Sequence, residues 1–342
     1  MENKRIDYLD ICKGILIILV VIGHVIQIID IDKDSYLIKF IYSFHMPAFF
    51  MISGYLFNAD KWKRKGFKEF LINRINKNLI PYFFFEYLYG FTAVLFSNHA
   101  GLNWKGWIME ALLVIKKSLT ARPNYVPSWF LITLFFAAIL VYWIEGNDRK
   151  RIIAGISVLT VISIAGGYFI RSMEEGFVQN LILFNTRIAF SAIFILIGIL
   201  WRELDFSKLH KTFFTVVCLA VTLLFPFYFE RESIYLFSFR FVTPFILTGI
   251  TGTYLTVALS KRLDFRFLRF LGRESMTIMG THYSFFALKR LAPGVYYSKY
   301  AVPICLAGII VLNTILIPVF NRFVPFLIGK KELPFLKQLH SE

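Results

Sequence analysis

Three residues near the start of the chain have the types and the spacing of an acid–base site. Asp10, Lys13 and His24 follow one another at intervals of three and eleven residues, and His24 lies inside the apolar run GILIILVVIGHVIQII. On an α-helix, three residues return to nearly the same face, and eleven close to within about 20° over roughly 16 Å of rise. The three side chains are therefore predicted to form a polar track along one helix face.

An ionisable residue inside an apolar span is costly and usually faces a polar interior, so His24 is a functional-site hypothesis. A neutral imidazole there is a natural general base for a reacting hydroxyl. The alternative is a histidine that is hydrogen-bonded to a neighbouring helix for packing. Asp10 and Lys13 are expected to pair at the mouth of the track, and the alternative for Lys13 is an interfacial lysine that snorkels beside an Asp partner.

The composition predicts the class of protein that must position these residues. Of 342 residues 57% are hydrophobic and only 18% are charged, less charge than a soluble domain of this size carries. Apolar runs of about twenty residues recur, each long enough to cross the hydrocarbon core. The first run is too long for a cleavable signal peptide. Cys12, Cys218 and Cys305 have neither disulfide nor metal-ligand spacing, and no metal site is expected.

The predicted fold is all-α: a polytopic membrane helical bundle of about ten transmembrane helices in a single domain over residues 1–342. We place the spans near 8–30, 35–57, 75–97, 127–145, 151–170, 180–201, 211–229, 238–260, 274–291 and 300–322. The long connection 98–126 contains NWKGWIMEALLVIKKSL, whose helical apolar spacing between Trp and Lys anchors favours a helix lying in the membrane interface.

The orientation follows from the basic residues in the loops. If the N-terminus is inside, 24 of the 38 Lys and Arg residues fall in inner segments, whereas the outer connections are acidic or mixed. The positive-inside rule therefore predicts cytoplasmic N- and C-termini. The net charge of +16 is explained by topology and by contact with anionic membrane lipids, so no nucleic-acid partner is expected.

Five segments carry a family resemblance: YLDICKGILIILVVIGH, FHMPAFFMISGYLF, RINKNLIPYFFF, PSWFL and FLGRESMTIMGTHYSFF. In this order and spacing they resemble the membrane acyltransferase 3 family, most closely its fucose 4-O-acetylase-like sugar O-acetyltransferases, over essentially the whole chain. The resemblance implies a multi-pass protein of the bacterial plasma membrane. It also implies transfer of an acyl group, commonly acetyl from cytoplasmic acetyl-CoA, to a sugar of a surface polysaccharide or its lipid-linked precursor.

In much of this family a basic residue, usually Arg, precedes the first-span His by ten intervening residues, and Lys13 holds that place here. Lys lacks the bidentate fork of Arg, which speaks against a planar phosphate clamp by this residue. His24 acts either as the general base on the acceptor hydroxyl or as the carrier of an acyl-imidazole intermediate. No permanently bound cofactor is expected, and acetyl-CoA is a substrate.

Further residues are candidates for substrate contact. His45 precedes the helix-breaking Pro47 and would bind the acceptor or orient His24. His282 matches a family histidine, and Trp129 of PSWFL offers a ring for stacking on a sugar. Arg240 and Glu86 are ionisable residues at or within spans, where facing a cavity avoids the cost of lipid exposure. The alternative for each is one half of a structural ion pair, which is the favoured interpretation for Glu86. Packing or interface anchoring is the alternative for the two histidines and Trp129.

Lys13 and four cytoplasmic cations are candidates for binding the phosphates of CoA. Arg74 and Lys77 precede the third span, and Arg269 and Arg273 precede the ninth. The alternative for each is a charge that only sets the orientation of a span.

The sequence thus predicts an integral-membrane O-acyltransferase that has an acyl-CoA donor and a glycan or lipid-linked sugar acceptor. A non-catalytic polysaccharide exporter or flippase on a related scaffold is the alternative. The acceptor sugar, the identity of the acyl group and the oligomeric state are left open.

Overall fold

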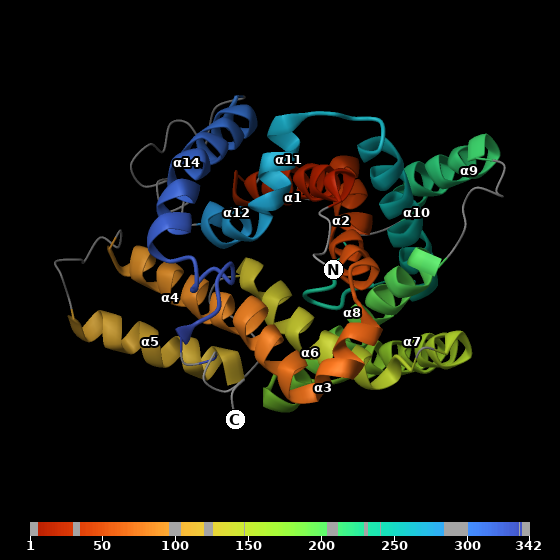
Figure 1. The fold of residues 1–342 in the computed structure, drawn as a ribbon, viewed down its shortest axis with the longest axis horizontal. Helices are drawn as coiled ribbons and strands as arrows, with labels where there is room; N and C mark the ends of the chain where they lie inside the picture. Colours follow the sequence, from red (N-terminus) through yellow and green to blue (C-terminus); the bar gives the residue numbers. More distant parts are fainter. Residues whose placement is uncertain are drawn as a thin grey trace. The chain divides into compact units, whose positions relative to one another are not determined.

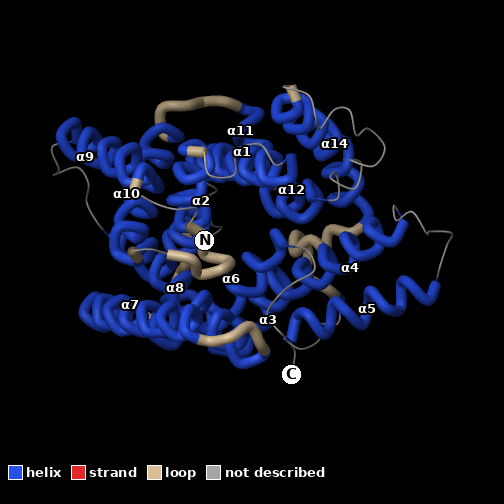
Figure 2. The backbone as a smooth tube through the Cα atoms, turned by 180° about the vertical axis from the view of Figure 1, so that it is seen from behind, coloured by secondary structure: helices blue, strands red, loops and turns tan. Residues whose placement is uncertain are grey.

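A computed structural model of the chain describes residues 6–29, 35–95, 104–119, 126–146, 148–203, 211–228, 232–239, 241–283, 300–334 and 336. The described part is helical (Figure 1). It contains no β-strand, only an isolated bridge between Ser233 and Ser238, and the described tube in Figure 2 is drawn as helices, loops and turns. The all-α prediction is confirmed.

Six of the described helices are long and apolar enough to cross a membrane. They are α1 (Asp7–Ile29), α2 (Tyr36–Tyr55), α7 (Arg149–Ser172), α8 (Phe177–Glu203), α10 (Val242–Ser260) and α14 (Ala301–Phe323). Shorter apolar helices are α6 (Trp129–Ile144) and α9 (Lys211–Leu224). Ten spans and cytoplasmic termini therefore stay predictions.

Two predicted spans differ in detail from the helices observed. The span predicted near 75–97 begins with a π-helical turn, η1 (Ile75–Leu79), which joins α3 (Ala59–Arg74) to α4 (Ile80–Leu95). The span predicted near 274–291 begins with the seven-residue helix α12 (Ser275–Thr281), and residues 284–291 lie outside the described part. The short helix α11 (Arg266–Arg273) precedes it.

The chain divides into two compact units that are described separately. Unit 1 consists of Met1–Phe57, Asp148–Tyr168 and Ala189–Ser275, and unit 2 of Asn58–Asn147, Phe169–Ile188 and Met276–Glu342. Unit 1 therefore contains α1, α2, α9, α10 and α11, with parts of α7 and α8. Unit 2 contains α3, α4, α6, α14, most of α12 and the helix α5 (Trp104–Leu119).

In unit 1, α2 packs against α10 through small residues of α10. The buried face of α10 consists mainly of Thr, Gly and Ser, and Cβ atoms at Gly249 and Gly252 would collide with Pro47 and Phe44 of α2. Small residues let two helix backbones approach closely, which is how helices associate within a membrane. Pro47 is therefore a packing residue of this contact as well as a break in the hydrogen-bond ladder of α2.

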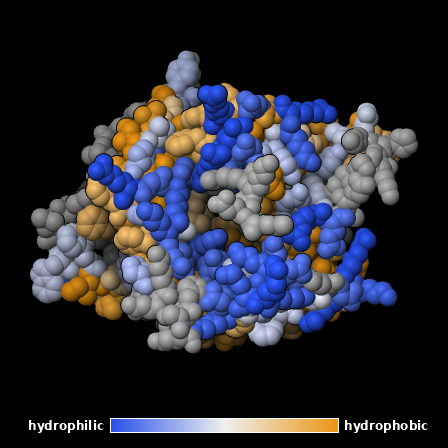
Figure 3. Space-filling view, in the orientation of Figure 1, coloured by the Kyte–Doolittle hydropathy of each residue, from blue (hydrophilic) through white to orange (hydrophobic). Residues whose placement is uncertain are grey.

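In unit 2, α5 lies alongside α4 (Figure 1) and presents a row of exposed apolar side chains: Trp104, Ile108, Met109, Leu112 and Ile115. Such a helix, apolar on one face and ending in Lys116 and Lys117, fits the expected interfacial position. The helix α3 carries the exposed residues Lys63, Arg64 and Lys65, and Figure 3 shows a hydrophilic area where α3 lies in Figure 1.

Candidate functional site

The first part of the candidate site is an ion-pair network between α1 and α11 in unit 1. Asp10 is 3% exposed, and its two carboxylate oxygens bind two different cations: Lys13 Nζ lies 2.7 Å from Oδ1, and Arg273 Nε lies 3.2 Å from Oδ2. The pair expected between Asp10 and Lys13 is therefore present. The buried carboxylate is compensated by charge-assisted hydrogen bonds, as a buried charge requires.

The network continues outward along α11. A second Arg273 nitrogen lies 3.3 Å from Asp7, Arg269 lies 3.7 Å from Asp7, and a 2.5 Å contact joins Arg269 to Asp264. Three cations and three carboxylates thus alternate from Lys13 to Asp264. The two arginines predicted to bind CoA phosphates lie in ion pairs, and their role toward CoA stays a prediction.

The network depends on a close approach of the two helix backbones. A Cβ atom on Gly14 would overlap the carbonyl of Leu268, and a Cβ on Gly272 would overlap the carbonyl of Asp10. Only glycine leaves room at these two positions. The sequence therefore places Arg273, which is next to Gly272, beside the carboxylate of Asp10.

His24 lies on the same continuous helix as this network, roughly 16 Å of helical rise beyond Lys13. Its predicted face is thus preserved, because α1 has no break between Asp7 and Ile29. The side chain is half-buried. Its neighbour in sequence, Gly23, lies against the ring of Tyr42 from α2, so Tyr42 reaches the turn of α1 that carries His24.

Tyr42 connects this turn to His45. Gln27 Nε2 donates to the Tyr42 hydroxyl at 2.5 Å, and the Tyr42 and His45 rings meet edge to face with centroids 4.9 Å apart. His45 is buried, and its Nδ1 lies 2.6 Å from the Ile41 carbonyl oxygen, which leaves Nε2 as its other functional nitrogen. Sequence reasoning missed Tyr42 and Gln27, since neither side chain is charged at neutral pH.

The second part of the candidate site is a group of buried polar residues in unit 2. Ser128 donates a short hydrogen bond to Glu86, and both side chains are fully buried. Trp129 follows Ser128, and the guanidinium of Arg187 lies 5.6 Å from its ring centroid. Sequence reasoning missed Arg187. A lone Arg within the apolar run FNTRIAFSAIF was the available signal, by the rule that singled out His24.

His282 also belongs to unit 2 and is fully buried. Its Nδ1 lies 3.0 Å from the Ile278 carbonyl oxygen. The preceding Thr281 donates to Asn313 of α14 at 2.5 Å, which fixes this end of α12. Gly280 packs against Phe85 of α4, the residue before Glu86.

Arg74 and Lys77 lie around the π-helical turn of unit 2. Arg74 lies 5.0 Å from the Phe70 ring centroid, and burial lowers its pKa to about 10, so it stays cationic at neutral pH. Lys77 is exposed. Phosphate contact by these two residues stays a prediction. Arg240 lies outside the described residues.

The structure therefore groups the sequence candidates in two sets. Asp10, Lys13, Arg269 and Arg273 share one network in unit 1, in which Asp10 and Lys13 belong to α1, the helix that carries His24, and the two arginines belong to α11. His45 belongs to the same unit, and Trp129, His282, Arg74 and Lys77 belong to unit 2. Within the described residues no group of three or more His, Cys, Asp or Glu side chains has the arrangement of a metal site.

Six described helices that are long and apolar enough to cross a membrane indicate a multi-pass membrane protein, and the first of them carries Asp10 and Lys13 of the ion-pair network together with His24. Comparison with known proteins makes this specific. Residues 6–328 match a family model described as an acyltransferase domain. The chain belongs to the acyltransferase 3 family.

Two curated relatives match part of the chain. Nodulation protein NolL of Sinorhizobium fredii (strain NBRC 101917 / NGR234) is 36% identical over 149 residues, which are 38% of this chain and 40% of the relative. Nodulation protein NolL of Mesorhizobium japonicum is 41% identical over 87 residues, or 24% of this chain and 23% of the relative. The matches thus span less than half of each relative. No solved structure matches the chain significantly.

Proposed function

We propose that this protein is an integral-membrane O-acyltransferase that transfers acetyl from cytoplasmic acetyl-CoA to a hydroxyl of a cell-surface polysaccharide or its lipid-linked precursor. Membership of the acyltransferase family supports the reaction class. The observation that carries the assignment to residues is the unbroken helix α1, which has the Asp10–Lys13 pair at its start and His24 within the span.

The reaction has a simple balance of bonds and protons. As the acceptor hydroxyl attacks the thioester carbon, His24 removes its proton, the C–S bond breaks, and the thiolate of CoA receives that proton from His24. In the second route the imidazole of His24 attacks first, CoA leaves as the thiol, and the hydroxyl then takes acetyl from the acyl-imidazole. Both routes give one ester and one free thiol.

The other candidates receive positions in this scheme. Lys13, whose Nζ is held by Asp10, is proposed to meet a CoA phosphate as a point charge. Arg74, Lys77, Arg269 and Arg273 are proposed as further phosphate contacts. His45, Trp129, Arg240 and His282 are proposed to contact the acceptor, with Trp129 as the ring on which a sugar stacks.

The test is acetyl transfer from labelled acetyl-CoA to a glycan acceptor by the purified protein in lipid nanodiscs. His24→Ala should reduce turnover by about 10² to 10⁴-fold, the contribution of a general acid–base group, while melting temperature and abundance stay unchanged. Leu37→Ala, an exposed position on the neighbouring helix α2, is the control and should keep full activity. Undiminished acetylation by the His24 variant would remove this residue from the mechanism.

The two chemical routes differ in what forms without an acceptor. The protein is incubated with acetyl-CoA alone, and the reaction is quenched. The protein is then digested, and the mass of the peptide that contains His24 is measured by mass spectrometry. An added acetyl group on His24 indicates the acyl-imidazole, and an unmodified peptide with normal turnover indicates general base catalysis. A deletion strain that loses surface glycan while the remaining glycan keeps its acetyl content would favour the exporter instead.

A further inference from the structure

A cavity of about 840 Å³ in unit 1 lies apart from the residues assigned above. It is bounded by the beginnings of α1 and α9 and by the last turns of α2, α8 and α10. Five helix ends therefore meet at one level, and four of these helices are among the apolar helices long enough to span a membrane. The level at which spanning helices end is that of the lipid headgroups.

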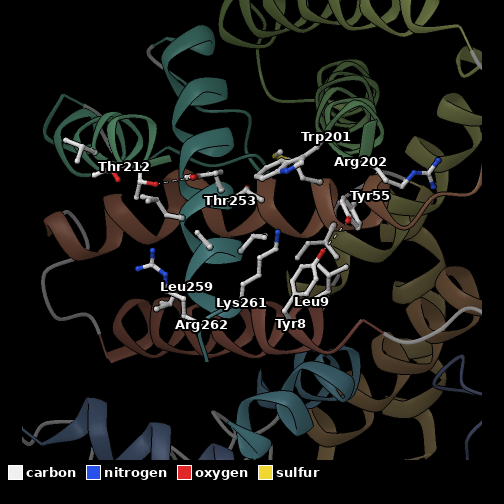
Figure 4. A pocket seen from close by; sticks show the side chains of 18 residues that line it. Tyr8, Leu9, Tyr55, Trp201, Arg202, Thr212, Thr253, Leu259, Lys261 and Arg262 are labelled. Atoms are coloured by element: carbon white, nitrogen blue, oxygen red, sulfur yellow. Dashed lines mark hydrogen bonds between the residues drawn. The ribbon is translucent and has the colours of Figure 1, made fainter. Parts of the chain in front are cut away.

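The polar part of the lining is cationic. Figure 4 shows Lys261 in the middle of the lining residues, with Arg262 on one side and Arg202 on the other. None of the described residues that line the cavity is an Asp or a Glu. In contrast to the alternating network of α1 and α11, this site has an excess of positive charge that an anion would balance.

The cations are held in place by aromatic and backbone contacts. Lys261 Nζ lies 5.0 Å from the ring centroid of Tyr8, and the Tyr8 hydroxyl is 3.1 Å from that of Tyr55. At the other end of the lining, an N–H of the Arg202 guanidinium donates a hydrogen bond to the Phe57 carbonyl oxygen at 2.7 Å. Lys261 and Arg262 are exposed and directly follow the last residue of α10, Ser260.

The rest of the lining is largely apolar and continues onto the outer surface of unit 1. It includes Leu255 and Leu259 from α10 and Val216 from α9. Val216 is 57% exposed and belongs to the same apolar face of α9 as Phe213 and Leu219. An occupant can therefore place a polar head beside the cations and extend an apolar chain along α9 into the bilayer. A free anion would leave this apolar lining unused.

We propose that this cavity binds an anionic phospholipid, with its phosphate beside Lys261 and Arg262 and an acyl chain against α9 and α10. The phosphate would accept charge-assisted hydrogen bonds from these two cations. The Tyr and Thr hydroxyls of the lining are suited to the glycerol and ester oxygens. Lipid binding here does not depend on acyl transfer, because neither His24 nor Lys13 lines the cavity.

The experiment measures lipid binding to the full-length protein. Phosphatidylglycerol is titrated into delipidated protein in neutral detergent, and the melting temperature and bound lipid by native mass spectrometry are followed. Phosphatidylglycerol should raise the melting temperature, whereas phosphatidylcholine should not. Lys261→Gln with Arg262→Gln should weaken phosphatidylglycerol binding by about tenfold, as expected when two charged contacts are lost.

The control is the double variant Arg149→Gln with Lys150→Gln. It removes the same amount of positive charge from an exposed pair at the start of α7, in the same unit. It should bind phosphatidylglycerol like the unmodified protein. Lys261→Arg keeps the charge and should also retain binding. Equal weakening in the α7 control would show that only general surface charge acts and would overturn the proposal.

Two further ligands test whether the bound phosphate belongs to a lipid or to a soluble molecule. Inorganic phosphate and CoA are titrated against the same variants. If either raises the melting temperature through Lys261 and Arg262 as strongly as phosphatidylglycerol does, the acyl chain contributes nothing and the lipid assignment is wrong. Retained phosphatidylglycerol binding in the Lys261/Arg262 variant would also overturn it.

Discussion

Gly272 of α11 lies directly against the main-chain carbonyl of Asp10 in α1, so closely that no Cβ atom fits between them. This backbone contact brings the side chain of the next residue, Arg273, to the carboxylate of Asp10. The geometry at the start of α1 is thus determined by the absence of a side chain as much as by the charged groups themselves.

Gly272→Ala should separate α1 from α11. The added methyl group requires a backbone shift, and overpacking of this kind costs about 1–3 kcal/mol. We expect a lower melting temperature and lower acetyl transfer. Gly308→Ala is the matched control, because nothing lies within 4 Å of a Cβ at that position in α14. If both variants melt alike, the close contact between α1 and α11 is not a determinant of stability.

The coupling between Asp10 and Arg273 can be measured with a double-mutant cycle. Arg273→Gln leaves the buried carboxylate with Lys13 as its remaining partner in this network, so the variant should be destabilised. Because Arg273 is 39% exposed, we expect a coupling of about 1 kcal/mol rather than that of a fully buried pair. Asp10→Asn should be less harmful in the Arg273→Gln background than alone. Arg266→Gln, an exposed charge on the same helix, is the control. Strict additivity of the two changes would contradict the pairing.

Substitution of Lys13 tests donor binding. If this lysine meets a CoA phosphate, Lys13→Ala should raise the KM for acetyl-CoA by about tenfold, the value of one charged contact, and leave the KM for the acceptor nearly constant. Lys13→Arg should retain donor binding, because it restores the residue that is common in the family. A rise confined to the acceptor KM would reverse the assignment.

We expect acetyl transfer to depend on the positive charge of Arg187 in unit 2. Arg187→Gln should reduce acetyl transfer to the acceptor more than Arg187→Lys does, since the cation over Trp129 is lost only in the former. Trp129→Phe retains an aromatic face and should keep more activity than Trp129→Ala. Kinetic constants for acceptor and donor, measured alongside melting temperature, separate binding from folding. Equal activity of the Gln and Lys variants would mean that the cation over the ring is unimportant.

Much of the helical architecture could be predicted, because apolar runs of about twenty residues indicate membrane-spanning helices. The helices around the predicted runs 151–170 and 300–322 match to within two residues at either end. The π-helical turn at Ile75–Leu79 could not be predicted, since hydropathy does not report the hydrogen-bond register of a helix. The contact of Gly14 with Leu268 was also inaccessible, because it joins segments far apart in the chain.

The candidate site was predictable where the signal is an ionisable residue in an unusual place. Asp10 and Lys13 are three residues apart, so their expected pairing follows from helix geometry alone. Its extension to Arg273 requires tertiary structure, and the sequence assigned that arginine to CoA instead. Tyr42 and Gln27 gave no signal, because uncharged residues beside a histidine resemble ordinary packing.

The pairing of Asp10 with Arg273 also has a consequence for biosynthesis. The two residues are 263 positions apart, so at about 5–20 residues per second the ribosome delivers Arg273 about 13–53 s after Asp10. During that interval the first helix must enter the membrane with a carboxylate whose arginine has not been made. Nascent chains that are truncated before α11 should therefore be the forms that insertion and quality-control machinery retains longest.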